Sequence, residues 1–145
     1  MAITTNAICN SFKKQLLEAT HNFSNPGGNT FKLSMYTNSA ALGKSTTSFT
    51  SGNEVTSPSG YSSGGLALVN VGTSIATNTA ITDFADLSFV GVTLTARGAL
   101  IYNDTPAGDP GVAVLDFGGD KTATAGTFTI QFPAFTTAAA ILRIA

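Results

Sequence analysis

Short apolar runs dominate the chain from residue 66 onward, and turn-forming glycine, asparagine and aspartate separate them. Branched and aromatic residues are frequent in these runs, as expected of strands on a partly buried pleated surface. Because no helical pattern intervenes, the runs predict an antiparallel sandwich or barrel. The expected strands cover residues 66–71, 75–80, 81–84, 87–94, 98–102, 112–117, 127–132 and 139–144.

The one helical pattern lies near the N-terminus, over residues 5–20. Ile8, Phe12 and Leu16 recur every four residues and form an apolar stripe. A threonine or an asparagine at the start of the segment supplies a cap. A stripe of this kind packs either on the sheet of its own domain or on a partner protein, and the pattern leaves both interpretations open.

Two segments of contrasting pattern follow the helix. Residues 30–36 alternate between apolar and polar positions, which predicts a half-buried strand. Residues 43–65 are rich in serine, threonine and glycine and hold few large side chains, among them Phe49 and Tyr61. We expect a long loop there with a short edge strand over residues 54–56, because a loop of this length inside one domain is usually functional or mobile.

Length and composition complete the prediction of the fold. The 145 residues suit one domain, and with 43% hydrophobic and 10% charged residues the chain is too apolar for intrinsic disorder. We therefore predict a single domain over residues 1–145. It is mainly β, an antiparallel β-sandwich or jelly-roll-like fold with one N-terminal α-helix over residues 5–20.

Charge excludes two classes of partner. The net charge is -1, with 7 basic and 8 acidic side chains, which predicts binding neither to nucleic acid nor to an anionic membrane. Threonine and serine occupy the positions that charged residues usually take on a surface. Few charges oppose association on such a surface, so it suits a protein docked in an assembly and favours a homo-oligomer, a dimer or a trimer.

Residues with catalytic chemistry are few, and none forms a convincing site. Residues 60–64 match the G-x-S-x-G motif of hydrolases, but a loop precedes them, a strand pattern follows, and the only histidine, His21, lies far upstream. The competing hypothesis of a small hydrolase is therefore the weakest one, and we predict no enzyme. Cys9, the single cysteine, is expected to be a small buried residue inside the helix.

Four aspartates in adjacent turns raise the alternative of a structural calcium ion, since carboxylate oxygens are its preferred ligands. Their spacing does not match an EF-hand, and aspartate is common in turns for its backbone hydrogen bonds. We predict no metal and no cofactor. These residues are Asp104, Asp109, Asp116 and Asp120.

Several blocks of the sequence are shared with a known group of proteins. They are NAICNSFKKQLLEATHNF (6–23), FKLSMYTNSAALGKSTTSF (31–49), GYSSGGLAL (60–68), TARGALIYN (95–103), VAVLDFGGDKTATAGTFTIQFP (112–133) and AILRIA (140–145). In this order they resemble small virion structural proteins of tailed bacteriophages. The resemblance implies a β-rich, non-enzymatic component of the phage particle, assembled in the cytoplasm of the bacterial host.

The resemblance leads to two expectations about the role. The first is a capsid decoration or cement protein, which binds the outside of the head and stabilises the assembled shell by mass action. Its partners are the major capsid protein or other virion proteins. The expected contact residues, chosen as apolar and aromatic anchors, are Ile8, Phe12, Leu16, Phe49 and Tyr61.

The alternative is a tail component, such as a fibre, tip or needle-head module. In that role the loop over residues 43–65 would contact the host surface, because binding residues concentrate on loops that a rigid scaffold holds. Composition does not separate the two expectations. The copy number in the particle separates them, because decoration proteins coat the shell while tail parts are few.

Overall fold

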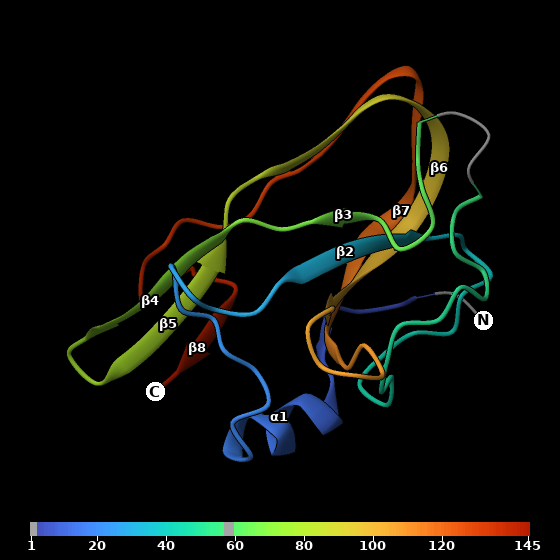
Figure 1. The fold of residues 1–145 in the computed structure, drawn as a ribbon. Coiled ribbons are helices and arrows are strands. Elements are labelled where there is room, and N and C mark those ends of the chain that lie inside the picture. The colour runs from blue at the N-terminus through green and yellow to red at the C-terminus, as the bar shows by residue number, and fades with distance from the viewer. Residues whose placement is uncertain (1–2, 57–59) are drawn as a thin grey trace.

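Two antiparallel sheets and a short helix form the part of the chain that the structure, a computed structural model, describes: residues 3–56 and 60–145 (Figure 1). The larger sheet has the order β1 (Ala7–Ile8), β7 (Gly111–Ile130), β6 (Leu87–Asn103), β2 (Phe31–Tyr36) and β3 (Leu66–Ala67). The smaller sheet has the order β4 (Asn70–Ala76), β5 (Thr79–Phe84) and β8 (Leu142–Ile144). The prediction of a mainly β, antiparallel, sandwich-like fold with one helix is confirmed, whereas a jelly-roll order of strands is not.

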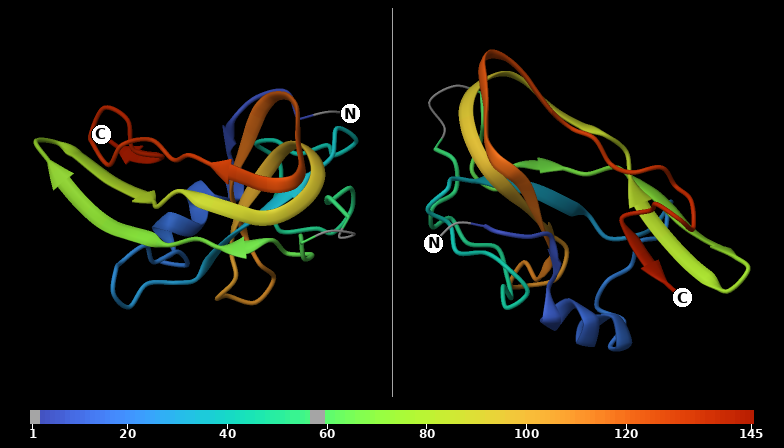
Figure 2. Two further views of the ribbon diagram at one scale, coloured as in Figure 1. Left: turned by 90° about the horizontal axis from the view of Figure 1, so that it is seen from above. Right: turned by 180° about the vertical axis from the view of Figure 1, so that it is seen from behind.

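The strands β6 and β7 form one long hairpin that bends over partway along its length, where the register of the pairing shifts (Figures 1 and 2). Four strands predicted over residues 87–132 are therefore two. The predicted turn at 118–120 lies inside β7: Gly118 adopts φ +76° there, and the pairing resumes at Lys121 opposite Ala96. Glycine reaches this left-handed conformation without steric cost, so the strand bends without ending.

The helix α1 spans Asn10–Leu17 and is shorter than the predicted 5–20. Ile8 belongs to β1 and pairs with Ala113 of β7, and the amide of Cys9 donates to the Val112 carbonyl at 3.0 Å. The backbone of the segment before α1 thus joins the larger sheet, and this pairing overrides the helical pattern at its start. At the other end, Ala19 at φ 58° terminates the helix.

The strand predicted over residues 30–36 is confirmed as β2, but it is buried on both faces. Ser34 and Tyr36, on the face expected to be solvated, are 0% exposed. The loop over residues 43–65 covers that face, and the Tyr36 hydroxyl donates to the Thr50 carbonyl at 2.7 Å. The expected edge strand over 54–56 is reduced to one bridge between Tyr36 and Glu54. Residues 57–59 of this loop lie outside the described residues.

The chain passes from one sheet to the other within the run predicted as a strand over 66–71. Leu68 donates its amide to Phe31 of the larger sheet, and Val69 accepts from Ala85, next to the smaller sheet. Two strands, β3 and β4, therefore replace the predicted one. The boundaries predicted for the strands over 75–80 and 81–84 are also wrong, because the turn falls at Thr77–Asn78, between β4 and β5.

Aromatic side chains join the two sheets and the helix into one core. Phe23, from the segment after α1, stacks on Phe31 of β2 with ring centroids 4.3 Å apart and planes at 6°. Phe84 of β5 contacts both rings, and Phe12 of α1 meets Phe23 edge-on at 6.0 Å. Offset and edge-on pairs of this kind each stabilise a core by about 0.5–1.5 kcal/mol beyond the area they bury. This cluster fixes α1 beside the smaller sheet.

Candidate functional site

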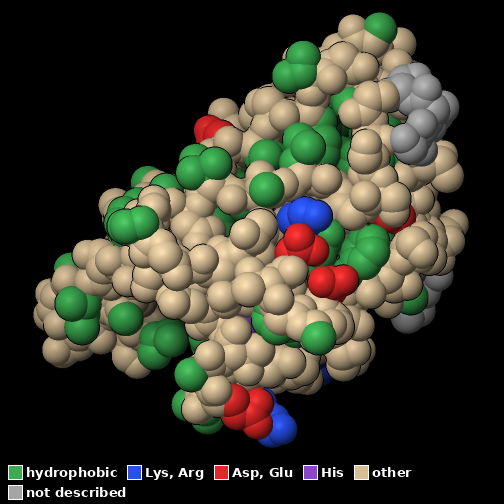
Figure 3. All heavy atoms as spheres, in the orientation of Figure 1, with side chains coloured by type: hydrophobic (Ala, Val, Ile, Leu, Met, Phe, Trp, Pro, Cys, Tyr) green, Lys and Arg blue, Asp and Glu red, His purple; other side chains and the backbone are tan. Residues whose placement is uncertain are grey.

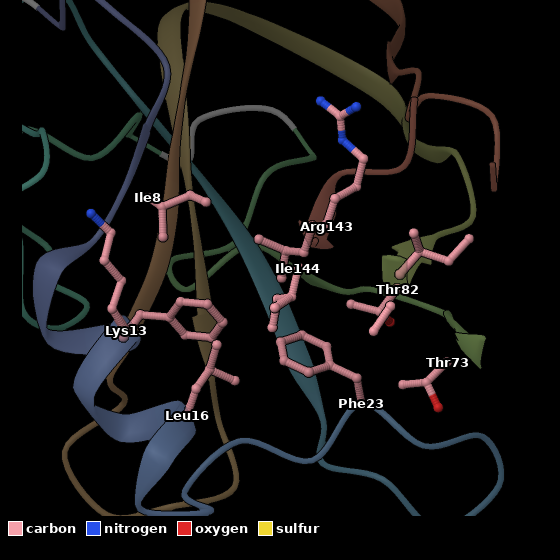
Figure 4. Close-up of a pocket in the computed structure, with 12 residues that line it drawn as sticks. Ile8, Lys13, Leu16, Phe23, Thr73, Thr82, Arg143 and Ile144 are labelled. Carbon is pink, nitrogen blue, oxygen red and sulfur yellow. The ribbon is translucent and has the colours of Figure 1, made fainter. Parts of the chain in front are cut away.

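A cavity of about 290 Å³ lies between α1 and the smaller sheet, and we call it the α1–β8 groove. Figure 4 shows Leu16 of α1 on one side, Thr82 and Ile144 of the smaller sheet on the other, and Phe23 between them. Apart from two cations and two threonines, the residues that line the groove are apolar. A concave apolar surface of this kind is the usual form of a binding site.

The helical period explains how the sequence places the first wall of the groove. Phe12 and Leu16 are four residues apart and share one face of α1. Phe12 is 2% exposed and enters the core, where its ring lies 4.8 Å from the ring of His21. Leu16, one turn further on, is half-buried at the margin of the core and lines the groove.

The second wall continues outward as an exposed apolar row across the smaller sheet. Ile75 of β4 pairs with Ala80 of β5, which pairs with Ile144 of β8. Side chains of directly paired residues project to the same face of a sheet. Leu142 stands two residues before Ile144, on this same face, and lines the groove. The row therefore extends the wall of the groove, with Ile75 70% and Ile144 62% exposed.

Further exposed apolar side chains lie on the elements that form the groove. Leu17, four residues after the groove-lining Lys13, is 92% exposed, and Ile8 of β1 is 39% exposed at the groove. Figure 3 shows hydrophobic side chains recurring over the smaller sheet and few charged ones on that face. Contiguous exposed apolar patches mark interaction surfaces more often than isolated apolar residues do. We call Ile8, Leu16, Leu17, Ile75, Ala80 and Ile144 the apolar docking surface.

The five contact residues predicted from the sequence occupy different environments. Ile8 and Leu16 both line the α1–β8 groove and are accessible there. Phe12 also lines the groove but is only 2% exposed, and Tyr61 is 1% exposed, so both are mainly core residues. Phe49 is half-buried and stacks on Tyr102, with ring centroids 4.9 Å apart. The structure thus brings together Ile8 and Leu16 and separates them from the two loop residues.

A buried carboxylate organises the loop over residues 43–65. Glu54 is 7% exposed, and its Oε1 accepts hydrogen bonds from the Tyr61 hydroxyl and the Gly64 amide, both at 2.7 Å. Its Oε2 accepts from the Ser63 hydroxyl at 2.7 Å. The Tyr61 oxygen in turn accepts the amide of Met35 in β2 at 2.9 Å. Hydrogen bonds to a charged group are among the stronger ones in proteins, so this network holds the loop against the sheet.

The three tyrosines of the chain all attach to this loop. Tyr36 donates to the Thr50 carbonyl and Tyr102 to the Gly64 carbonyl, each at 2.7 Å. Burial raises the pKa of all three hydroxyls above the ordinary value, so they stay protonated donors at neutral pH. The described parts of the loop are therefore tied to the core through side chains, although their composition is that of a solvated linker.

His21 has a structural position in the aromatic cluster. Its Nε2 lies 2.9 Å from Gln15 Oε1, and its Nδ1 lies 3.1 Å from Asn103 Nδ2. This arrangement fits a neutral ring that donates from Nε2 and accepts at Nδ1. Burial lowers the pKa of His21 to about 4, which keeps the ring neutral at physiological pH.

Cys9 is the N-cap of α1 rather than a residue inside the helix, because the backbone before Asn10 pairs with β7. Its side chain is 0% exposed, as the prediction of a small buried residue requires. Burial raises the pKa of its thiol to about 11. The reactive thiolate is therefore scarce at neutral pH.

The structure shows the surroundings of the residues considered above as a catalytic serine or as calcium ligands. Ser62, the serine of the G-x-S-x-G match, is exposed in the loop, and the strand β3 follows the motif where a nucleophile elbow has a helix. Asp104 pairs with Lys32 at 3.2 Å, and Asp116 pairs with Arg97 at 3.3 Å. Within residues 3–56 and 60–145, no three His, Cys, Asp or Glu side chains gather as metal ligands.

No family model, curated protein or solved structure matches this chain. Within the described residues, α1 is too short to span a bilayer, and no other helix is present that would do so.

Sequence reasoning missed the exposed row on the smaller sheet. The available signal is the alternation around Ile75 together with the turn residue Asn78, but the predicted strand runs over residues 75–80, straight through that turn. With the turn at Thr77–Asn78, Ile75 and Ala80 become cross-strand neighbours. The contribution of Ile144 had no local signal, because it depends on the C-terminal strand returning to β5.

Proposed function

We propose that this protein is a non-enzymatic structural component of a bacteriophage particle, a decoration or cement protein that binds the outer surface of the head. The resemblance of its sequence blocks to small virion proteins of tailed phages suggests the particle. The observation that carries the proposal of docking is the apolar docking surface beside the α1–β8 groove, on a chain with only 10% charged residues. An apolar surface of this extent gains free energy when another protein covers it.

The mechanism requires no reaction. A protein that binds the assembled shell but not its dissociated subunits stabilises the shell by RT ln(1 + [L]/Kd), which is about 2.7 kcal/mol per site when the ligand is at a hundred times Kd. The docking surface lies on α1, on β1 and on strands of the smaller sheet, so it needs little ordering on binding. Preorganisation of this kind lowers the entropic cost of association.

The copy number in purified particles tests the proposal. Quantitative mass spectrometry of particles is expected to give this protein a ratio to the major capsid protein near one, or a simple fraction of one. A ratio of a few per cent would overturn the decoration role and favour the tail component. The loop over residues 43–65 would then be the segment to test for binding to the host surface.

A matched pair of variants tests the surface itself. Particles that lack the protein are incubated with purified wild type, Ile144→Asp or Val90→Asp. Ile144 and Val90 are both exposed, at 62% and 73%, but only Ile144 lies on the apolar docking surface. We expect Ile144→Asp to lose binding about tenfold or more, since a charge in an apolar interface is desolvated without a partner. Equal binding of the two variants would place the contact elsewhere.

A further inference from the structure

We infer that the α1–β8 groove binds an acidic-apolar segment of a partner protein: an aliphatic or aromatic side chain enters the groove, and carboxylates on either side of it bind Lys13 at one rim and Arg143 at the other. This inference rests on the proposed docking function and specifies its partner chemistry. It rests on charge as well as on shape, because the groove contains cations and no acidic residue.

The two charged residues that line the groove are both basic, Lys13 of α1 and Arg143 of β8. Figure 4 shows Lys13 at one end of the groove, beside α1, and Arg143 at the other, with Ile8 between them. Among the described residues, three of the five other cations pair with a carboxylate, Lys14 with Glu18, Lys32 with Asp104 and Arg97 with Asp116, while Lys44 and Lys121 do not. Among the described residues, neither Lys13 nor Arg143 has an acidic partner, so an incoming carboxylate meets positive charge that is not neutralised.

Arg143 is held in position while most of its donors stay free. Its Nη1 donates to the carbonyls of Ala138 at 2.7 Å and Thr137 at 3.5 Å. These bonds fix the guanidinium without neutralising it, because backbone carbonyls carry no net charge. Within the described residues, Nε and Nη2 have no hydrogen-bond partner. A guanidinium offers five N–H donors, and a carboxylate binds two of them at once, so a fixed arginine is a suitable anchor for a carboxylate.

The same charges disfavour a second copy of this chain as the occupant. If the groove faces of two copies met, Lys13 and Arg143 of both would lie in one interface. The acidic residue on α1, Glu18, already pairs with Lys14 at 3.0 Å. Like charges juxtaposed at an interface cost free energy. Charge complementarity therefore favours a partner with acidic residues beside its apolar anchor.

The experiment starts from a random peptide library selected on the immobilised full-length protein. The selected peptides are expected to carry aspartate or glutamate next to leucine, isoleucine or phenylalanine. The affinity of the best peptide is then measured by fluorescence anisotropy for wild type, for Lys13→Glu/Arg143→Glu, and for Lys44→Glu/Lys121→Glu. The last variant has the same change in net charge at two exposed lysines outside the groove.

We expect the Lys13→Glu/Arg143→Glu variant to bind the peptide about tenfold more weakly and the control variant to bind it within about twofold of wild type. The affinity of wild type is expected to fall as salt is added, because ions screen the rim charges. Selected peptides without acidic residues, or an equal loss in both double variants, would overturn the inference. So would dimers of the wild type that Ile144→Asp dissociates, since a second copy would then cover the groove.

These results are distinguishable from a failure of the proposed function. If the protein is absent from phage particles but binds acidic-apolar peptides as described, the phage role is wrong and the chemistry of the groove stands. If the Lys13→Glu/Arg143→Glu variant binds particles as well as wild type does, the decoration role stands and the inference about the groove is wrong.

Discussion

The loop over residues 43–65 and the smaller sheet both depart from the usual rule that polar residues are exposed and apolar residues are buried. The loop is rich in serine, threonine and glycine, yet it contributes Glu54 and Tyr61, which are 7% and 1% exposed. The smaller sheet has the alternating pattern of an ordinary strand pair, yet it leaves Ile75 and Ile144 largely exposed. Composition alone would assign the contact surface to the loop, whereas the exposed apolar groups lie on the sheet.

The difference shows that a polar loop becomes rigid when its polar groups satisfy one another. The Glu54 carboxylate accepts three hydrogen bonds, one of them from the Tyr61 hydroxyl. The same hydroxyl accepts a hydrogen bond from the amide of Met35 and so links the loop to β2. In the part of the chain that the structure describes, the smaller sheet has three strands, and no segment covers the row that contains Ile75. Its exposed face is consistent with a surface that another protein completes.

The largest expected effect is that of breaking the loop network. Glu54→Ala removes the acceptor of the Tyr61 hydroxyl and of the Gly64 amide, so we expect the free energy of unfolding to fall by about 3 kcal/mol. Urea unfolding measures it. The control is Glu18→Ala, in an exposed pair, where the expected change is below about 0.5 kcal/mol. A loss under about 1 kcal/mol for Glu54→Ala would mean that the network does not hold the loop.

The same substitution at two isoleucines of the smaller sheet compares a buried position with an exposed one. Ile81 is 7% exposed and Ile75 is 70% exposed. We expect Ile81→Ala to lower the free energy of unfolding by about 2.5 kcal/mol, from lost burial and the cavity left behind. Ile75→Ala is expected to change it by less than about 0.5 kcal/mol. Similar losses for the two variants in thermal or urea unfolding would contradict the exposed position of the row.

Acid is expected to destabilise the protein through His21. Its pKa of about 4 in the folded state lies below the ordinary value of 6.5, so the unfolded chain binds the proton more readily. The stability that neutral His21 provides is therefore lost as the pH falls from 6.5 toward 4. Between pH 7 and pH 5 the expected loss is roughly 1.5–2 kcal/mol.

The His21→Gln variant is the control for this pH dependence, because the chain contains no other histidine. Burial raises the pKa of Asp83, an effect that works in the opposite direction at lower pH and is present in both proteins. The difference between the two proteins thus isolates the histidine. Equal slopes of unfolding free energy against pH would show that His21 is not the group responsible.

The smallest effect concerns Cys9. Because its thiol is 0% exposed and burial raises its pKa to about 11, we expect iodoacetamide at pH 8 to leave the native protein unlabelled for hours. In denaturant the same thiol is expected to react fully, and mass spectrometry distinguishes the two forms. Rapid labelling under native conditions would mean that the segment linking β1 to α1 opens readily.

Particular elements show how much of the fold could be predicted from the sequence. The alternation over residues 30–36 correctly identified β2, because one face of that strand had to enter the core. It did not reveal that Ser34 and Tyr36 are also buried, since the cover comes from a loop distant in sequence. The glycines at 118–119 indicated a turn, but cross-strand pairing with β6 carried the chain through them.

Only some residues of the candidate site could likewise be predicted from the sequence. Ile8 and Leu16 were identified from the helical stripe, and both line the groove. Ile75 and Ile144 were not, because their neighbourhood depends on β4, β5 and β8 pairing in one register. Phe49 and Tyr61 were chosen as large residues in a polar loop, but Tyr61 is buried by the hydrogen bonds that fix that loop.

Periodicity and composition are enough to predict a mainly β, charge-poor chain with one amphipathic helix, because both are properties of neighbouring residues. Tertiary structure alone decided which apolar residues stay exposed and where the groove forms. Strand pairing brings together residues more than sixty positions apart, such as Ala80 and Ile144. A local pattern carries no information about which distant strand will cover a given face, so the docking surface emerges only when the sheets assemble.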